Sequence, residues 1–305
     1  MTNKRTGAFI QLLPSILMIA KKSIPIRQLT KVCDPSSEFR MLSLSELLKK
    51  EELKQQIHRH DFYFMLIVIK GTGKHTIDFT IFKIEPSMVF FMRPGQIHEL
   101  DLDAGTTGFI LEFSGDFVPK VSENSRYMFN SISQHNALTF NIKSLQPVLQ
   151  SAEKIYSESQ IDFIEKNEVI RLHLHLIFIE LYRQVAIQQL VQEQDSDAFT
   201  KEKLYTFLEL LEKNIHRKKR VSEYAEMMNL TPYQLNNITK SVLNKSVSIL
   251  IKDQVLLEAK RLLLTTSNQV NQIAIELGFE DVSYFIRFFK KHLGSSPAVF
   301  RQNFK

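Results

Sequence analysis

The side chains with the clearest chemistry lie in the last third of the chain, on helices predicted by the spacing of apolar residues. Asn236 and Asn237 are neighbours on one such helix, and the amide of asparagine can form two hydrogen bonds with adenine. Tyr233 and Lys240, on the same helix, can hold phosphate oxygens. Arg287 lies on a later helix with an exposed polar face. These residue types indicate a nucleic acid as the ligand.

Imidazole groups form a second set of candidate side chains, in the N-terminal half. His58 and His60 lie two residues apart, and His98 follows the turn residues Pro94–Gly95. Three histidines can bind a transition metal, but histidines beside a turn can equally be structural. Arg93 can pair with a carboxylate or phosphate of a ligand, and a surface ion pair is the alternative role for this residue.

Two helix-turn-helix patterns position the residues of the first set. In the C-terminal pattern, Ala274 is small enough for a second helix to cross closely. Gly278 can end the first helix in the left-handed conformation, and Asp281 can cap the next one. An equivalent helix centred on Ala225 begins the other pattern. A long amphipathic helix at 248–264 separates the two and would let them reach successive major grooves, about 34 Å apart.

The charge distribution favours a polyanion as the partner of this segment. Residues 201–305 carry 17 Lys and Arg against 10 Asp and Glu, whereas residues 1–200 carry 22 against 23. The whole net charge of +6 therefore comes from the C-terminal third, as expected of a segment that binds DNA. A solvated basic surface without a partner is the alternative that charge alone leaves open.

The N-terminal half has the pattern of an all-β domain. Stretches rich in β-branched and aromatic residues, separated by turn residues, predict strands at 63–70, 75–82, 88–92 and 107–113. Short strands at regular spacing are typical of a sandwich or a barrel.

From about residue 144 to residue 193 the apolar period becomes helical. A helix that is apolar on two sides packs against two partners. One partner is the strand domain, and the other is either a second protomer or another helix layer of the same chain. The candidate dimerisation residues are Ile170, Leu174, Ile177 and Leu181. A second apolar stripe consists of Leu172, Leu176 and Ile179.

A motif with many parts at fixed spacing runs through the C-terminal segment. It consists of Glu258–Leu263, Ile273–Ala274, Leu277–Phe279, Asp281, Ser283–Phe285, Arg287, Phe289–Lys291, Gly294 and Ser296–Pro297. On this motif, residues 200–305 resemble the AraC/XylS family of transcriptional regulators. The resemblance implies two helix-turn-helix motifs joined by a linker helix, of which the second follows the family pattern more closely.

The first helix-turn-helix departs from the family at three positions. The family often has arginine where Asn237 stands, an aromatic residue at Thr239 and glycine at Asn244. Asparagine tolerates the left-handed conformation, so we expect the turn to be retained. The change at 237 favours recognition of adenine over guanine or phosphate. The residues expected to contact DNA are Thr231, Tyr233, Asn236, Asn237, Lys240, Val282, Ser283, Tyr284, Arg287, Lys290 and Lys291.

The histidine motifs of the N-terminal half, across about 40–115, resemble the two motifs of the cupin barrel. In metal-binding cupins, three residues separate the second histidine of the first motif from a glutamate that also binds the metal. In this sequence Phe64 occupies the position of that glutamate. We therefore expect no metal and no other cofactor. In AraC-type regulators the resemblance implies a sensor domain that holds a small effector. The expected pocket residues are His58, His60, Tyr63, Arg93, His98 and Glu112.

We therefore expect a multidomain protein. An all-β cupin-like sensor domain would span 21–143, a helical connector with the dimer interface 144–196, and an all-α DNA-binding domain 197–305. Residues 1–20 are interpreted as an N-terminal extension and not as a signal peptide, because their apolar run is short and no cleavage pattern follows. The single cysteine, Cys33, excludes an internal disulfide and suits the cytoplasm.

The expected function is that of a cytoplasmic regulator that is not an enzyme and does not enter a membrane. It would bind double-stranded DNA as a homodimer, under control of an unknown small-molecule effector. The resemblance favours an activator, which would also contact RNA polymerase. Two alternatives remain: a DNA-binding regulator without an effector, and a metal-dependent cupin enzyme with a DNA-binding tail.

Overall fold

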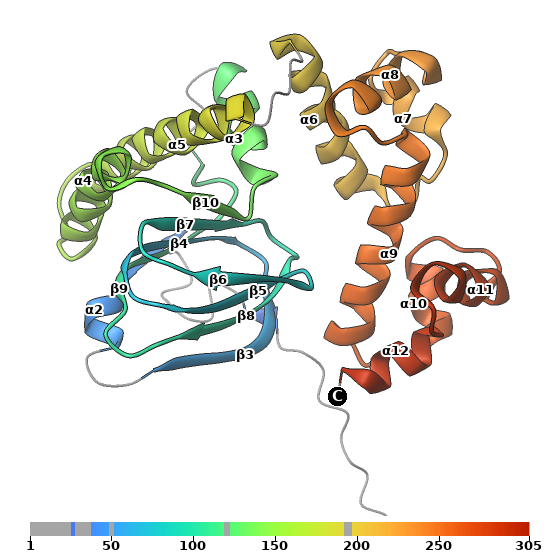
Figure 1. The fold of residues 1–305 in the computed structure, drawn as a ribbon, viewed down its shortest axis with the longest axis horizontal. Coiled ribbons are helices and arrows are strands. Elements are labelled where there is room, and N and C mark those ends of the chain that lie inside the picture. Colours follow the sequence, from blue (N-terminus) through green and yellow to red (C-terminus); the bar gives the residue numbers. More distant parts are fainter. Residues whose placement is uncertain (1–25, 28–37, 49–51, 119–122, 192–196, 305) are drawn as a thin grey trace, which may run out of the picture.

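A β-rich domain lies beside an all-helical domain in the computed structural model (Figure 1). The structure describes residues 26–27, 38–48, 52–118, 123–191 and 197–304. The predicted extension at 1–20 and Cys33 lie outside these residues. Among the described helices, none combines the length and the apolar character needed to cross a bilayer.

Two five-stranded sheets build the β-domain and enclose a core between them. The first sheet, in spatial order, consists of β1 (Ile26–Arg27), β3 (Leu53–His60), β8 (Ile97–Leu102), β5 (Gly73–Ile77) and β6 (Thr80–Ile84). The second consists of β10 (Ala137–Thr139), β7 (Met88–Met92), β4 (Tyr63–Lys70), β9 (Thr107–Phe113) and β2 (Phe39–Ser43), which α2 (Leu44–Leu47) follows. The inner faces contribute Phe64, Leu66, Phe90, Leu100 and Ile110, all nearly inaccessible to solvent.

Three of the four strands predicted from the sequence have the bounds seen in the structure, and the fourth does not. The strands at 63–70, 88–92 and 107–113 have the predicted bounds. The prediction of one strand at 75–82 was wrong, because the chain reverses at Asp78 and Phe79 with φ values of 45° and 71°. No glycine marks this turn, so its apolar pattern resembles one continuous strand.

Three helices cover the outer face of the second sheet (Figure 1). They are α3 (Glu123–Ser133), α4 (Ile142–Ser159) and α5 (Lys166–Val191). Met65, Ile67 and Phe91 of the sheet pack in one core with the buried residues of these helices. The predicted helical segment from residue 144 onward is therefore a helix layer that packs on the sensor domain.

The predicted dimer stripe is buried in this layer. Ile170, Leu174, Ile177 and Leu181 are at most 1% exposed and belong to the core under the sheet. They are not accessible to a second protomer, so their assignment as dimer contacts was wrong. In the neighbouring stripe, Leu172 is 61% exposed and Leu176 is 48% exposed, whereas Ile179 is half-buried and packs against the same core. The sequence identified both stripes, but the one chosen as the candidate dimer contact is the buried one.

The C-terminal domain consists of helices in two small bundles joined by a long helix. The helices are α6 (Ala198–Asn214), α7 (Val221–Met227), α8 (Pro232–Leu243), α9 (Val247–Thr265), α10 (Val270–Glu276), α11 (Val282–Leu293) and α12 (Pro297–Asn303). Residues from the first half of α9 complete one core with α6, α7 and α8. Residues from its second half complete the other core with α10 and α11.

Candidate functional site

The first helix-turn-helix consists of α7 and α8. Ala225 at the centre of α7 is 1% exposed, as its small side chain predicts. The chain turns at Asn229, which has a φ of 53°, and the side chain of Thr231 caps α8 by accepting a hydrogen bond from the Gln234 amide. Asn244 ends α8 in the left-handed conformation, which confirms that asparagine replaces the usual glycine there.

The second helix-turn-helix consists of α10 and α11, and its turn depends on Gly278. Its φ is 72°, and a Cβ atom at this position would lie 2.3 Å from the carbonyl oxygen of His216. Glycine is therefore required both for the backbone conformation and for the close approach. Asp281 caps α11, its carboxylate accepting a hydrogen bond from the Ser283 amide at 2.7 Å.

Most of the residues predicted to contact DNA lie on the exposed faces of α8 and α11. Tyr233 is 74% exposed and Tyr284 is 54% exposed. Val282 differs, because it is half-buried and packs against the second core. The remaining exposed members of the set are Thr231, Asn237, Lys240, Ser283, Arg287, Lys290 and Lys291.

Asn236 has a structural role that the sequence did not reveal. Its amide nitrogen donates to the carbonyl oxygen of Pro232 at 3.0 Å, and its amide oxygen accepts from the Val247 amide at 3.1 Å. One end of the side chain is thus bonded within α8, and the other end joins α8 to the start of α9. In this conformation the amide does not offer the pair of groups that adenine requires, whereas Asn237 is exposed.

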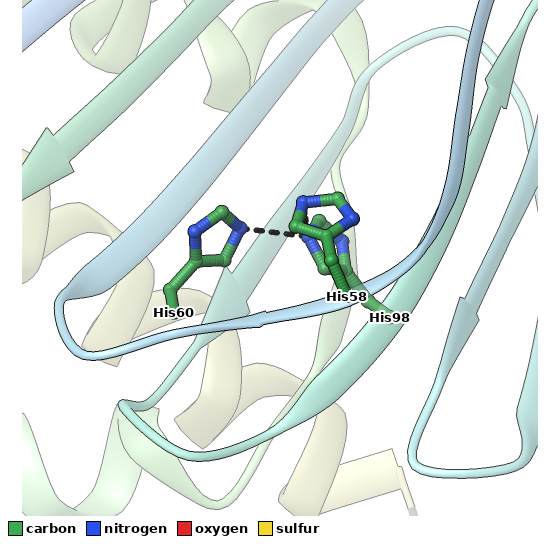
Figure 2. A group of neighbouring side chains, drawn as sticks. All are labelled: His58, His60 and His98. Carbon is green, nitrogen blue, oxygen red and sulfur yellow. Dashed lines mark hydrogen bonds between the residues drawn. The ribbon is translucent and has the colours of Figure 1, made fainter. Parts of the chain in front are cut away.

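Buried histidines form a cluster inside the β-domain (Figure 2). The Nε2 atom of His98 lies 2.8 Å from Nε2 of His60 and 3.0 Å from Nε2 of His58. Nδ1 of His58 lies 2.7 Å from the Gln56 carbonyl oxygen, which can only accept, so this nitrogen carries the proton.

A fourth histidine adjoins the cluster on β5. Nε2 of His75 lies 2.8 Å from Nδ1 of His98. Burial, together with the nearby His58, lowers the pKa of His75 to about 3, so its imidazole is neutral at physiological pH. The sequence prediction did not include His75, because it lies outside the histidine motifs.

The six predicted pocket residues do not share one cavity. His58, His60 and His98 lie in the barrel interior, and Glu112 pairs there with Arg40 at 3.3 Å. Tyr63 lies on the opposite face of its sheet and stacks on Phe91 and Phe113 beneath the helices. Arg93 pairs with Glu212 of α6 at 3.3 Å. The structure therefore does not bring Tyr63 and Arg93 together with the histidines.

A separate cavity of about 300 Å³ lies where β2 meets the α4–α5 corner. None of the six predicted pocket residues lines it. Its lining includes Glu38, Arg40, Phe117, Lys166 and Asn167.

A buried ion pair joins the two domains. Asp78, at the tip of the β5–β6 hairpin, accepts two hydrogen bonds from Arg261 of α9, at 2.6 and 2.9 Å. The side chains are 11% and 3% exposed. Within the β-domain, Asp78 also accepts from the Gln96 side chain at 2.7 Å and from the Ile97 amide at 3.3 Å. The hairpin tip is thus bonded both to β8 and to the linker helix.

Further contacts surround this ion pair. The Lys260 ammonium lies 3.9 Å from the centroid of the Phe79 ring, and Phe79 meets Phe300 of α12 edge to face. Burial by itself would lower the pKa of Arg261, but the carboxylates of Asp78, Glu258 and Glu212 together raise it above its ordinary value. The guanidinium is therefore charged in a buried position. The sequence indicated Arg261 only as part of a motif and gave no sign of its partner.

Comparisons with known proteins agree with this architecture. Residues 53–208 match the family model described as the AraC-like ligand binding domain, and residues 224–303 match a helix-turn-helix domain model. The two parts define a DNA-binding transcription regulator with a ligand-binding domain. The chain belongs to the AraC family.

Relatives span most of the chain. The uncharacterized HTH-type transcriptional regulator YfiF of Bacillus subtilis is 22% identical over 252 residues, covering 82% of this chain and 79% of the relative. The HTH-type transcriptional activator RhaR of Mannheimia succiniciproducens is 24% identical, covering 81% and 87%. The crystal structure of ToxT from Vibrio cholerae bound to an unsaturated fatty acid is 17% identical, with a TM-score of 0.40 over 86% of this chain and 94% of that one.

Proposed function

We propose that this protein is a transcription regulator whose DNA binding is controlled by a small molecule held in the interior of the β-domain. The buried ion pair between Asp78 and Arg261 is the observation that carries the proposal. A charged pair taken out of water needs good geometry to persist, and breaking it has a large free-energy cost. Such a contact attaches the β-domain directly to the linker helix between the two helix-turn-helix motifs.

A short series of bonds connects the barrel interior to this ion pair. His98 contacts the other histidines of the cluster, and the amide of the preceding residue, Ile97, donates to Asp78. A ligand that displaces His98 would therefore move β8 and weaken or strengthen the hold of Asp78 on Arg261. Because a ligand shifts an equilibrium only by its differential affinity, the effector must prefer one of these two arrangements.

On DNA, α8 and α11 would enter successive major grooves about 34 Å apart. Asn237 and Arg287 would contact bases, and Tyr233 would contact the backbone. We propose that the output is activation, through contact with RNA polymerase in the cytoplasm. The relative RhaR is a transcriptional activator by name, which supports this direction.

We propose a homodimer formed through the outer stripe of α5. Leu172, Leu176 and Ile187 are each about half exposed or more, at 61%, 48% and 51%. A second copy of the same stripe would remove this apolar surface from water. Leu176→Glu should convert dimer to monomer in light scattering, whereas Lys83→Glu, at an exposed position on β6 of the other sheet, should leave the dimer intact.

Genome-wide mapping of bound sites, followed by affinity measurements on one mapped site, tests the proposed function. A panel of metabolites drawn from the neighbouring genes should contain one that changes the dissociation constant at least tenfold. That change should shrink in Asp78→Asn, in which the path to the linker helix is weakened. If every metabolite leaves both DNA affinity and melting temperature unchanged, the protein is a regulator without an effector and the proposal fails.

A further inference from the structure

Three imidazoles converge on one point in the barrel interior (Figure 2). The Nε2 atoms of His58, His60 and His98 face one another, and the ligand atoms of the three side chains all lie within 4.8 Å of one another. All three side chains are at most 3% exposed. The residues come from two neighbouring strands, β3 and β8, with His58 directly opposite His98 in the register.

When all three imidazoles are neutral, hydrogen bonds alone do not satisfy both short contacts of His98 Nε2. The proton of neutral His58 is on Nδ1, which donates to Gln56, so Nε2 presents a lone pair. Nε2 of His98 lies within 3.0 Å of this lone pair and also of the His60 Nε2. One proton on His98 can bond strongly with only one of the two. A single cation, by contrast, can accept a lone pair from all three nitrogens.

The hydrogen-bond partners of the other ring nitrogens of His58 and His98 also suit a metal site. Histidines that bind a metal usually donate their other ring proton to a carbonyl, a carboxylate or water, which fixes the tautomer and the ring orientation. His58 has this arrangement with Gln56, at 2.7 Å. With Nε2 of His98 directed to a metal, its Nδ1 proton would be donated to Nε2 of His75, at 2.8 Å.

We propose that His58, His60 and His98 bind one divalent transition-metal cation of the zinc class through their Nε2 atoms. Phe64 stands at the position that led us to expect no metal, but three imidazoles are a sufficient set for zinc when the fourth position remains open. Zinc–nitrogen bonds of about 2.0–2.1 Å place tetrahedral ligands about 3.3 Å apart. The His98 ring therefore needs to separate from His58 and His60 by only a few tenths of an ångström, and the ligand atoms of His58 and His60 lie within 4.8 Å of each other. Neutral imidazoles without a carboxylate favour zinc, copper, nickel or iron(II) over magnesium or calcium.

The proposed cation would also define how a ligand is held. Three neutral ligands leave the double positive charge of the ion uncompensated in an apolar interior. The open fourth position therefore suits an anionic oxygen of a small molecule, such as a carboxylate. This proposal stands on the histidine geometry and does not depend on the contact between the two domains.

The test uses the full-length, untagged protein carrying Cys33→Ser, which removes the one thiol. The protein is freed of metal with a chelator, dialysed against Zn²⁺ and assayed by elemental analysis. We expect one zinc per chain more in this protein than in His60→Ala or His98→Ala, and at least a 100-fold loss of affinity in each variant. His135→Ala is the matched control, because His135 is a partly buried histidine on the α3–β10 segment, outside the cluster.

Two further measurements keep the proposal falsifiable if the histidine variants do not fold. Zn²⁺ should raise the melting temperature of the metal-free protein and saturate at one equivalent, whereas Mg²⁺ should not. Co²⁺ bound in place of zinc should show visible absorption bands typical of tetrahedral coordination, and these should vanish in His98→Ala. Less than about 0.1 zinc per chain with no thermal shift, or equal zinc content in parent and variants, would show that the cluster is a purely hydrogen-bonded one and would overturn the proposal.

Discussion

Asp78→Asn is the substitution that tests most directly how the two domains communicate. The change keeps the size of the side chain but removes the charge that faces Arg261. Removing one partner of a buried ion pair typically costs about 3–5 kcal/mol. Here the guanidinium retains Glu258 at 3.1 Å and Glu212 at 3.9 Å, both within its own domain. We therefore expect a lower cost, about 2 kcal/mol, in the contact between the domains.

A cost of about 2 kcal/mol corresponds to about a 30-fold shift from docked to separated domains. The cost should not appear as unfolding of either domain, because separation exposes Arg261 to water. The assay is single-molecule energy transfer between dyes at two highly exposed positions, Ile164 in the β-domain and Ile275 in the helical domain. In Asp78→Asn the transfer distribution should broaden and shift to low efficiency.

The matched control is Glu85→Gln, in the same hairpin. Glu85 pairs with Lys83 at the surface, where the two side chains are 56% and 77% exposed. Loss of such a pair costs at most about 1 kcal/mol and involves no second domain. If Asp78→Asn leaves the energy-transfer distribution identical to that of Glu85→Gln, the ion pair does not hold the domains together and the proposed path is incorrect.

Three other substitutions test separate parts of the structure. Arg287→Ala should weaken DNA binding about 10- to 100-fold and reduce the salt dependence of the affinity, whereas Lys83→Ala on β6 should do neither; equal affinities would mean that α11 does not face DNA. Gly294→Ala should lower the free energy of unfolding by about 1–2 kcal/mol through backbone strain alone. Gly278→Ala should lower it by more, because its new Cβ atom would also collide with a neighbouring carbonyl oxygen. Burial lowers the pKa of His135, so its contribution to the free energy of unfolding should be greatest above about pH 6.5 and decrease on acidification. In denaturant titrations from pH 7 to 5, the free energy of unfolding of His135→Gln should therefore decrease less steeply than that of the parent, by at most about 1.4 kcal/mol per pH unit. An equal slope would show that His135 titrates alike in the folded and unfolded chains.

The sequence predicted the features that depend on local chemistry. Caps such as Thr231 and Asp281, and left-handed residues such as Gly278 and Asn244, follow from the conformations that these side chains favour. Such features need only a few neighbouring residues. They therefore define the helix-turn-helix units without knowledge of the rest of the molecule.

Features that depend on distant partners were not predicted. The apolar stripes of α5 were visible, but nothing in their spacing told which one faces the sheet. The pairing of Asp78 with Arg261 joins residues 183 positions apart, and no pattern in either segment signals it. Asn236 has an amide that suits adenine, yet the start of α9 engages it first. In each case tertiary packing decided between roles that the residue type left open.

The long helix α9 has a consequence for the DNA sequences that this protein can recognise. Its 19 residues span about 28 Å, and its side chains complete the cores of both helix-turn-helix units. Gly278 also brings the turn of the second unit against the backbone at His216, which follows α6 in the bundle that contains the first unit. Two units fixed in this way cannot follow half-sites that move apart. Inserting five base pairs between the two contacted segments rotates one to the opposite side of the duplex and should abolish binding, and control by the β-domain must act on the pair of units as one body.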